Sequence, residues 1–363
     1  MLRKVTSLRV SCPRLNIRQT FVLLLLPITA LLLLSAQYVC NCDQDATATS
    51  LRQTPTRVDT IEPIRTDILE EYELIICTLV RDSASTTLPN LRALEVIAKA
   101  FKSSYFIIVE NDSEDGTDKL LASWVTRREE HVRLISRKME EEMSQDPSMP
   151  APPLNHDDFP LSALRFHKMA VLRNLYVDVL DTLPQMSKRN TLVAIVDLDL
   201  KSIPIDDTLR SLSAILSQGK DMRMDWDLVC ANGIVSNCRV QALGSESCQF
   251  VRKDNGENGR AYDSLATRLT QDEMDNGFTV GPGMEAPPNH RDRWKAHEAA
   301  VGSKLNSRDA PPLRVKSCFG GVAVYRARSL QGKRYSGGDC EHMSVNGKLD
   351  NVYIVPDFNV YYD

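Results

Sequence analysis

The sequence lacks the features that mark several specialised classes of protein. It contains no C-x-x-C pair, which argues against a structural zinc site, and it has no internal repeats. Basic residues are not in excess, because 44 Lys and Arg stand against 48 Asp and Glu, a formal net charge of −4. A nucleic-acid binder is therefore disfavoured, since affinity for a duplex rests on a basic face. The ordinary composition, 42% hydrophobic and 25% charged, excludes wholesale disorder and a multi-spanning membrane protein.

Acidic residues are also absent from the first 42 positions, where all charged side chains are basic: Arg3, Lys4, Arg9, Arg14 and Arg18. Residues 20–39 then form an uncharged apolar run, close to the roughly 20 residues that a helix needs to cross a bilayer. The basic flank predicts a cytosolic tail at residues 1–19 and a transmembrane signal anchor at 20–40. A cleaved signal peptide is the alternative, since Ser35 and Ala36 are small. The length of the run favours an uncleaved, single-pass type II anchor.

The remainder of the chain is thus expected in the lumen of the Golgi or the endoplasmic reticulum. Residues 41–72 are rich in Thr, Asp and Pro without periodicity, and we interpret them as a stem. Six cysteines follow the stem: Cys77, Cys230, Cys238, Cys248, Cys318 and Cys340. An oxidising compartment permits disulfides between them. The sequence does not choose among their 15 possible pairings, but we expect the cluster of Cys230, Cys238 and Cys248 to hold at least one disulfide.

Residues 73–363 are interpreted as one α/β head with a mostly parallel sheet flanked by helices. Apolar strand-like runs alternate with helically spaced segments, which implies parallel strands joined by right-handed crossovers. The strands are expected at 73–80, 105–110, 132–136, 192–200, 226–234 and 317–326, and the helices at 90–102, 118–128 and 161–180. Residues 139–160 are expected to form a surface loop. Residues 253–315 contain many Gly, Pro and charged residues and indicate a long loop, either a functional lid or a disordered segment. Trp294 and His297 in this loop are lesser candidates for closing over a ligand, and surface positions are the plainer interpretation of both.

A D-x-D pair ends the strand-like run LVAIV, at Asp197 and Asp199. Ligands of open α/β sheets bind beyond the carboxyl ends of the strands, and paired carboxylates suit Mg²⁺ or Mn²⁺ bridging a diphosphate. The other two D-x-D pairs, Asp43/Asp45 and Asp225/Asp227, lie in the stem and before a strand. The plainer interpretation of Asp197 and Asp199 is a solvated strand end.

The acidic stretch 110–117 follows another strand-like run, and its short acceptors could hold a base or a ribose hydroxyl. An acidic turn that caps the next helix is the plainer interpretation. Asn111 also begins the one N-glycosylation sequon of the chain, Asn111-Asp112-Ser113. A glycan there would block a pocket, so we predict that Asn111 is unmodified.

The sequence Gly337-Gly338-Asp339-Cys340-Glu341-His342 brings two acids, a thiol and an imidazole together. Glycosyl transfer needs a carboxylate that deprotonates the acceptor or steadies a cationic sugar, and Asp339 or Glu341 fits this role. His342 fits a third metal ligand or a donor to phosphate. A structural histidine is the plainer interpretation of His342 alone.

The order ICTLVRD, IIVENDSEDGT, AIVDLDL, FGGVAVYR and SGGDCEH resembles nucleotide-sugar-dependent glycosyltransferases of the GT-A fold over about residues 73–363. It is most similar to the fungal capsule-associated mannosyltransferase-like group, glycosyltransferase family 69 and its relatives. The resemblance implies that Asp197 and Asp199 hold a divalent ion and the sugar diphosphate. It further implies nucleotide contacts by Thr78, Arg81, Glu110, Asn111 and Asp112, and an approach of Arg165, Arg173 and Asn174 to the diphosphate or the loops around it.

These observations together predict a type II membrane glycosyltransferase that moves a hexose, mannose in the nearest resemblance, from a nucleotide-diphosphate sugar to a glycan hydroxyl with Mn²⁺ or Mg²⁺. Two alternatives stay open. One is a membrane-tethered glycan-binding protein with an inactive transferase fold. The other is an aspartyl-nucleophile phosphatase, which shares the hydrophobic-D-x-D pattern but prefers Thr or Val where Lys201 stands.

Overall fold

The computed structural model describes residues 64–155, 161–220, 224–235, 239–240, 246–247, 265–271, 279–305 and 310–362. These residues belong to one compact unit. The predicted cytosolic tail, the anchor at 20–40 and most of the stem lie outside the described residues. Within the described ranges, no helix is both long enough and apolar enough to cross a membrane.

The described elements begin with alternating helices and strands, as expected. In chain order they are α1 (Thr66–Leu69), β1 (Glu73–Val80), α2 (Ala84–Ala98), β2 (Ser103–Asn111), α3 (Thr117–Val125), η1 (Glu129–His131), β3 (Val132–Arg137), α4 (Met139–Ser144), α5 (Ala163–Leu180), η3 (Pro184–Ser187), β4 (Thr191–Asp197) and α6 (Ile205–Lys220). The second half contains β5 (Leu228–Val235), β6 (Arg239–Val240), β7 (Glu246–Ser247), α8 (His290–Leu305), β8 (Leu313–Val315), β9 (Val322–Arg326), α9 (Ala327–Leu330), α10 (Glu341–Asn346) and β10 (Val352–Tyr362).

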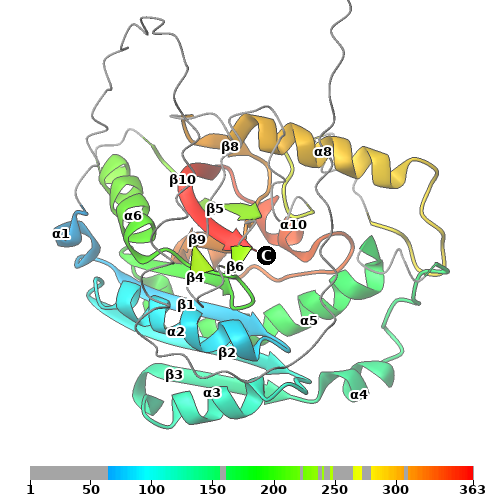
Figure 1. Ribbon diagram of the computed structural model, residues 1–363, viewed down its shortest axis with the longest axis horizontal. Coiled ribbons are helices and arrows are strands. Elements are labelled where there is room, and N and C mark those ends of the chain that lie inside the picture. The colour runs from blue at the N-terminus through cyan, green and yellow to red at the C-terminus, as the bar shows by residue number, and fades with distance from the viewer. Residues whose placement is uncertain are drawn as a thin grey trace, which may run out of the picture. The chain divides into compact units, whose positions relative to one another are not determined.

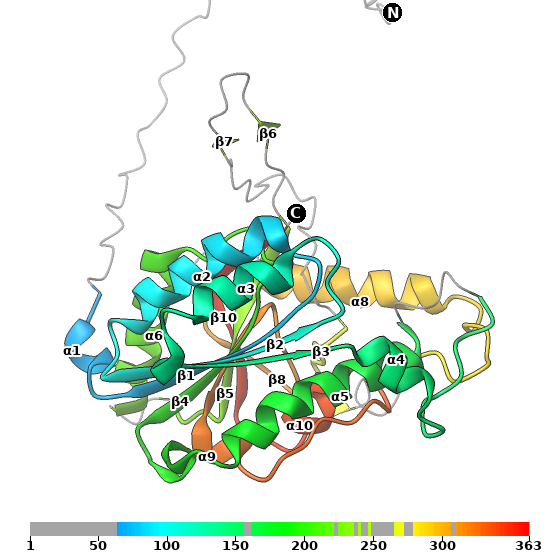
Figure 2. The ribbon, with the colours of Figure 1, turned by 90° about the horizontal axis from the view of Figure 1, so that it is seen from below.

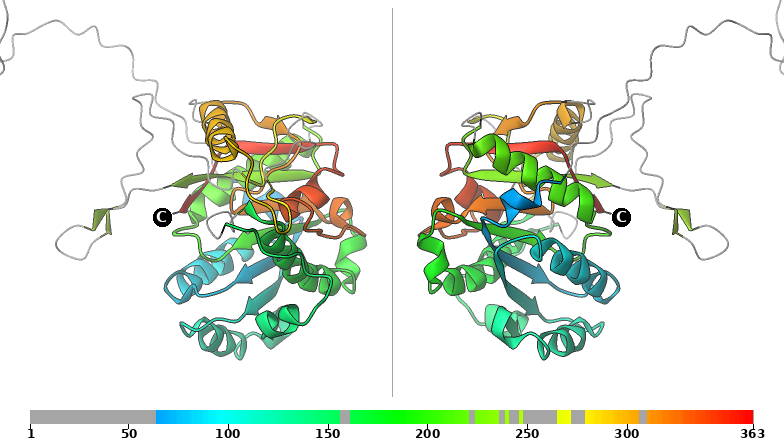
Figure 3. Two further views of the ribbon diagram at one scale, coloured as in Figure 1. Left: turned by 90° about the vertical axis from the view of Figure 1, so that its right-hand side faces the viewer. Right: turned by 90° about the vertical axis from the view of Figure 1, so that its left-hand side faces the viewer.

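Eight of these strands form the central sheet, in the order β3-β2-β1-β4-β9-β5-β10-β8. The neighbours β3, β2, β1 and β4 are parallel, and so are β5 and β10. β9 is antiparallel to both β4 and β5, and β8 is antiparallel to β10. The N-terminal elements, blue to teal, lie toward one edge of the sheet and the orange and red C-terminal elements toward the other (Figure 3). The expected mixed α/β fold with a mostly parallel sheet is confirmed.

Helices cover both faces of this sheet (Figure 2). Alternate side chains of β1 point to opposite faces, so Ile75 and Cys77 enter one apolar cluster while Leu74 and Ile76 enter the other. The first cluster includes side chains of α4, α5, α8 and α10, and the second includes side chains of α1, α2, α3 and α6. Burial on both faces explains why β1 is a continuous apolar run instead of an alternating one.

Two expectations about loops were wrong in part. α4 forms inside the predicted surface loop at 139–160, and α8 forms inside the predicted long loop at 253–315. α8 escaped notice because it is strongly polar, and its buried contacts are confined to a few residues such as His297, Val301 and Leu305. His297 is buried and its Nε2 lies 2.9 Å from the Thr267 carbonyl oxygen, a structural contact.

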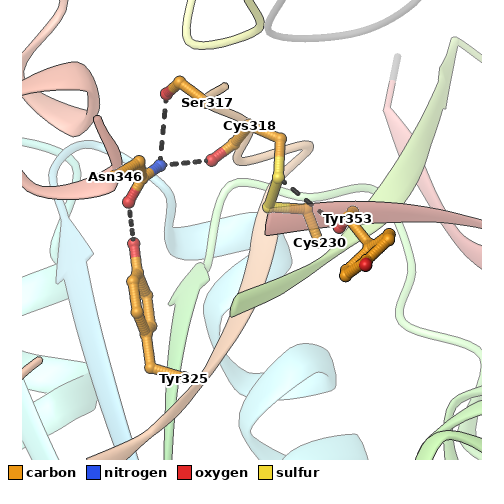
Figure 4. Close-up of a disulfide and its surroundings, with 6 residues drawn as sticks. All are labelled: Cys230, Ser317, Cys318, Tyr325, Asn346 and Tyr353. Carbon is orange, nitrogen blue, oxygen red and sulfur yellow. Dashed lines mark hydrogen bonds between the residues drawn. A yellow bond between two sulfur atoms is a disulfide. The ribbon is translucent and has the colours of Figure 1, made fainter. Parts of the chain in front are cut away.

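One cysteine of the cluster of Cys230, Cys238 and Cys248 forms a disulfide in the structure. Cys230 of β5 is bonded to Cys318, 88 residues later, which lies outside that cluster. Cys238 and Cys248 lie outside the described residues. The Asn346 side chain braces the Cys318 end, since its amide donates to the Cys318 carbonyl at 2.7 Å and its oxygen accepts from the Tyr325 hydroxyl at 2.7 Å (Figure 4). The free thiols of Cys77 and Cys340 are both buried.

Candidate active site

A cavity of about 380 Å³ opens beyond the carboxyl ends of β1, β2 and β4. Figure 1 shows the tips of β1 and β2 directed toward α5 and α4, which form its walls. Ligands of open α/β sheets bind at this place. The side chains that line the cavity are Leu79, Val80, Arg81, Ser83, Asn111, Asp112, Met139, Glu140, Met143, Arg165, Lys168, Met169, Leu172, Arg173, Asp197, Asp199, Cys340, Glu341 and His342.

Most of the site residues expected from the sequence lie in this lining. They come from five separate segments of the chain: Arg81, Asn111 and Asp112, Arg165, Asp197 and Asp199, and Glu341 and His342. The lining does not include Thr78, Glu110 or Asp339. Thr78 is fully buried in β1, and its hydroxyl has no hydrogen-bond partner among the described residues.

The end of β2 is fixed by its own carboxylates. Glu110 is buried and accepts hydrogen bonds from the Ser113 backbone N–H at 3.0 Å and from the Ser136 hydroxyl. Asp112 holds a left-handed backbone with φ of 52° and accepts from the first two backbone N–H groups of α4, Met139 and Glu140, each at 3.1 Å. Glu110 therefore stabilises the turn after β2 from outside the cavity, while Asp112 links this turn to the start of α4 in the cavity wall.

Asn111 lies in the cavity wall with little exposed surface. The residue is 6% exposed, and its side-chain amide donates to the Asp112 carboxylate at 3.2 Å. A glycan on this amide would have to fill the cavity. The prediction that Asn111 is unmodified therefore stays a prediction, now with a steric reason.

The D-x-D pair sits on a turn that α2 holds from behind. Leu198 is fully buried between the two aspartates, which lets both carboxyls line the cavity. The Thr86 hydroxyl donates to the Leu198 carbonyl at 2.8 Å, and the Asn90 amide donates to the same carbonyl at 3.1 Å and to that of Leu200 at 2.5 Å. Neither α2 side chain was anticipated, since nothing in the sequence links residues more than 100 positions apart.

Asp199 has an exposed surface, but the protein that surrounds the rest of the side chain changes its ionisation. Burial raises its pKa, and the Arg173 charge offsets this only in part. No ion pair within the described part of the chain involves Asp199. The ionised form of Asp199 therefore lacks enough nearby positive charge to offset the cost of its burial.

Arg173 of α5 lies among the carboxylates of two different motifs. Its Nε is 2.8 Å from Glu341 Oε1, and its Nη2 is 3.6 Å from Asp197 Oδ1. Arg173 and Glu341 are 2% and 3% exposed. Burial by itself raises the pKa of Glu341, but the Arg173 guanidinium, with smaller contributions from His342 and Arg165, outweighs it, so the pKa is lower than the ordinary value. Glu341 is therefore an ionised carboxylate at neutral pH.

His342 stands beside this pair as a neutral ring. It is stacked on Phe319, with ring centroids 4.0 Å apart, and its exposed fraction is 1%. Burial and the Arg173 charge lower its pKa to about 3. Neither ring nitrogen has a hydrogen-bond partner among the described residues, and Nε2 lies 3.6 Å from Glu341 Oε1. No three His, Cys, Asp or Glu side chains in the described ranges are grouped to hold a metal ion, so the expected trio of Asp197, Asp199 and His342 is not assembled.

Asp339 serves a different part of the structure. Its carboxylate accepts from Arg268 Nη2 at 3.4 Å, from the Thr279 hydroxyl, and from the Cys340 backbone N–H at 2.7 Å. Arg268 has no exposed surface. Asp339 therefore ties two segments of the predicted long loop to the start of α10. Of the two proposed catalytic carboxylates, only Glu341 faces the cavity.

Sequence reasoning named Arg165 and Arg173 but did not place Lys168, Met169 and Leu172 in the cavity wall. Together these five residues occupy one face of α5, at spacings of three and four residues. A cationic stripe with this spacing, placed before the D-x-D strand, is the signal that could have identified the wall. The methionines of α4 carried no comparable signal.

One protein family is similar to this chain over most of its length. The family model described as Cryptococcal mannosyltransferase 1 matches residues 75–346, more than half of the chain. No curated protein matches the sequence.

Solved structures give distant matches. S. aureus TarS 1-349 has 12% identity over 80% of this chain and 60% of its own, with a TM-score of 0.37. Mannosyltransferase PcManGT from Pyrobaculum calidifontis, in complex with GDP-Man and Mn²⁺, has 11% identity over 79% of this chain and 56% of its own, with a TM-score of 0.37. GalNAc-T7 with UDP, GalNAc and Mn²⁺ has 10% identity over 80% and 44%, with a TM-score of 0.38. The chain spans less than two thirds of each of these three proteins.

Proposed function

The chain belongs to the Cryptococcal mannosyltransferase 1 family, and on that premise we propose that it transfers mannose from a nucleotide-diphosphate sugar to a glycan hydroxyl. The head is then a GT-A-like transferase domain. One observation supports the proposal most. Asp197 and Asp199 line a cavity whose lining also includes the cations Arg165 and Lys168. Carboxylates and cations in the lining of one cavity suit a ligand that is bound partly through a divalent ion and partly through phosphate oxygens.

Asp197 and Asp199 would hold the Mn²⁺ or Mg²⁺. Both are hard oxygen donors, and the raised pKa of Asp199, caused by burial, is what a carboxyl shows when it lacks enough positive charge nearby. Bound there, a divalent cation would supply charge that stabilises the departing diphosphate. Arg165 and Lys168 would orient the phosphates from the α5 wall. Arg81, Asn111 and Asp112 would meet the nucleoside at the ends of β1 and β2.

Glu341 is the carboxylate of this site that would face the reacting sugar. Because Arg173 keeps its pKa low, Glu341 is a weak base. Its ionised form is better suited to steadying an oxocarbenium-like sugar than to removing the acceptor proton. Of the two roles that the sequence left open for a carboxylate, Glu341 is thus assigned the stabilisation of the cationic sugar.

We further propose that the protein is a single-pass type II membrane protein of the Golgi or endoplasmic reticulum, with the head in the lumen. The basic tail and the apolar run at 20–40 support this topology. The disulfide between Cys230 and Cys318 supports the lumenal side, because such bonds form and persist in oxidising compartments.

The test uses the full chain in detergent, incubated with GDP- and UDP-sugars and mannose-containing glycans, while free nucleoside diphosphate is measured. Release should require Mn²⁺ or Mg²⁺ and should be abolished by EDTA. Asp199→Asn should lower the rate by about 100-fold or more, since one of two carboxylate ligands is lost. The matched control is Asp225→Asn, an exposed member of another D-x-D pair, which should keep full activity. Glycan binding without any nucleotide affinity would instead indicate a tethered glycan-binding protein.

A further inference from the structure

A second cavity, of about 410 Å³, lies where the chain leads into α8, and we call it the α8 cavity. Its volume is within the range of small-ligand sites, about 300–1,000 Å³. It shares no lining residue with the cavity beyond β1, β2 and β4. The residues that line it are Asn155, Glu285, Ala286, Pro287, Asn289, His290 and Asp292. The chain therefore has a polar site that the proposed donor chemistry does not use.

Two segments that are far apart in the sequence build the α8 cavity. The Leu154 backbone N–H donates to the Met284 carbonyl at 3.2 Å, and the Gly283 N–H donates to the Pro152 carbonyl at 3.2 Å. In Figure 1, the yellow segment before α8 meets the green segment after α4 at this place. These bonds hold one wall, with Asn155, against the other, so the cavity is formed before any ligand binds.

The chemistry of the lining favours a neutral ligand that carries hydroxyl groups. Its amides offer both donors and acceptors, and its carboxylates accept. Among the described residues, the lining contains no Lys or Arg, so an anion would meet Glu285 and Asp292 without a cation to offset their repulsion. The described ranges also contain no group of three His, Cys, Asp or Glu side chains arranged for a metal ion. A neutral polyol, such as a hexose unit, fits this lining best.

Apolar side chains flank the two walls of the α8 cavity. Leu154 and Met284, whose backbones are hydrogen-bonded to each other, are 70% and 58% exposed. Only one other large apolar residue in the described ranges, Val96 of α2, is exposed. Exposed apolar side chains that lie together, rimmed by polar residues, mark binding sites. A hexose presents C–H groups as well as hydroxyls, so this pair adds an apolar contact to the polar lining.

The α8 cavity is tied to the wall of the first cavity. The Val280 N–H donates to the Leu161 carbonyl at 2.7 Å, and the Val280 carbonyl accepts from the Ala163 N–H at 3.1 Å, at the start of α5. Arg165, two residues later, lines the first cavity. Glu285 is five residues beyond Val280, so their Cα atoms are at most about 18 Å apart. An oligosaccharide that ends in the first cavity can thus extend into the α8 cavity.

We propose that the α8 cavity is an acceptor subsite, which binds a neutral hexose unit of the glycan away from the hydroxyl that receives the sugar. The inference rests on the proposed function and deepens it, because it places the acceptor on the chain. Binding energy from parts of a substrate that do not react can be used to hold the reacting group for transfer. The subsite therefore selects long acceptors over short ones and leaves the donor untouched.

The test uses the full chain in a detergent without a sugar head group, since such a head group would compete. The acceptors are methyl mannoside and linear mannotetraoses of differing linkage. The variant is Glu285→Ala with Asn289→Gly, at two exposed positions. Glycine tolerates the left-handed backbone of residue 289, whose φ is 66°. The matched control is Glu130→Ala with Asn190→Ala, also at exposed positions, and thermal unfolding shows whether both proteins are folded.

We expect a higher kcat/KM of the wild-type chain for at least one mannotetraose than for methyl mannoside. The Glu285/Asn289 variant should lower kcat/KM for that mannotetraose by about tenfold or more, the worth of hydrogen bonds that include a charged group. Its kcat/KM for methyl mannoside and its donor hydrolysis should stay unchanged, and the control should keep all three rates. Equal losses on both acceptors, or no loss on mannotetraose, would overturn the inference.

Calorimetric titration with the same mannotetraoses in EDTA, without nucleotide, separates this inference from the proposed function. Wild-type binding that the Glu285/Asn289 variant loses, in a protein that releases no nucleoside diphosphate, would overturn the proposed function and leave a glycan site in place. Normal nucleoside diphosphate release with a mannotetraose affinity that is equal in the wild-type chain and the variant would overturn the subsite alone. Mannotetraose that is neither bound nor used by the wild-type chain would also overturn the subsite.

Discussion

The side-chain amide of Asn90 donates to the main-chain carbonyl of Leu198, although the two residues are 108 positions apart in the chain. The same amide reaches the Leu200 carbonyl, so one side chain of α2 holds the backbone on both sides of Asp199. The aspartate's direction is therefore set by a buried contact on the opposite face of the turn.

Asn90→Asp tests this contact, because it preserves the shape and removes the donor. The new carboxylate would face two carbonyl oxygens without a proton to share. We expect the free energy of unfolding to fall by about 1–3 kcal/mol or more and the metal-dependent affinity for nucleoside diphosphate to weaken. Urea titration and calorimetry measure these two quantities. Asn190→Asp is the control, since Asn190 is exposed and its amide makes only a 3.4 Å bond to Glu71; equal effects of the two substitutions would contradict the assignment.

Gly337 and Gly338 provide a second matched pair. A Cβ on Gly337 would lie 2.2 Å from the His167 Cα of α5, whereas a Cβ on Gly338 would meet nothing within 4 Å. Gly337→Ala should push the D-C-E-H turn away from α5 and cost about 1–3 kcal/mol of stability, with a loss of transferase activity. Gly338→Ala should change neither by much. Thermal unfolding and donor turnover measure the two effects. If both substitutions leave stability and activity unchanged, the predicted clash at Gly337 is contradicted.

The disulfide predicts a large stability difference that depends on redox state. Cys230 and Cys318 close a long loop, and removing a native disulfide from a secreted domain typically costs 2–5 kcal/mol. The double variant Cys230→Ala with Cys318→Ala should lose about this much by urea unfolding. Dithiothreitol should lower the free energy of unfolding of the wild-type chain to that of the double variant and leave the variant's value unchanged. A wild-type chain that is insensitive to the reductant would show that this bond is not formed in the purified protein.

His342 predicts a loss of stability in mild acid. Its folded-state pKa is lowered to about 3 by burial and the Arg173 charge, so the unfolded chain takes up a proton first as the pH falls below about 6.5. Stability is then lost between pH 6.5 and 3, and about 2 kcal/mol of this loss falls between pH 7 and 5. Urea unfolding of His342→Phe should show a flatter dependence on pH over that interval. His131→Gln, at an exposed position, should leave the wild-type slope intact; an equal slope for all three proteins would contradict the prediction.

The features that could be predicted from the sequence are those that depend only on a short, continuous segment of the chain. β1 is found at its expected bounds, because ELIICTLV is buried on both faces and needs no partner to be recognised. Asp197 and Asp199 reach the cavity because β4 ends where its apolar run ends. The family match confirms the resemblance to the fungal capsule-associated mannosyltransferases and, with it, the expectation of a glycosyltransferase.

The features that failed depend on contacts between distant segments. The partner of Cys230 was left open because spacing along the chain does not reveal which strands become neighbours. Asp339 was expected in the cavity beside Glu341, but Arg268 and Thr279 draw its carboxylate elsewhere. The burial of Arg173 could not be predicted, because a charged residue on a helix has no local mark of burial. The roles of the cavity residues remain predictions for the experiments above.

The antiparallel strand β9 has a consequence for how the protein is made. It separates β4 from β5 in the sheet, although β4 ends at Asp197 and β9 begins only at Val322. At roughly 5–20 residues per second of synthesis, the edge of β4 waits several seconds or more on the ribosome before its partner emerges. An open strand edge is a template for pairing with other chains. The strand that leads into the D-x-D pair thus has an edge open to wrong pairing in the nascent chain, and substitutions that slow the arrival of β9 should appear as aggregation.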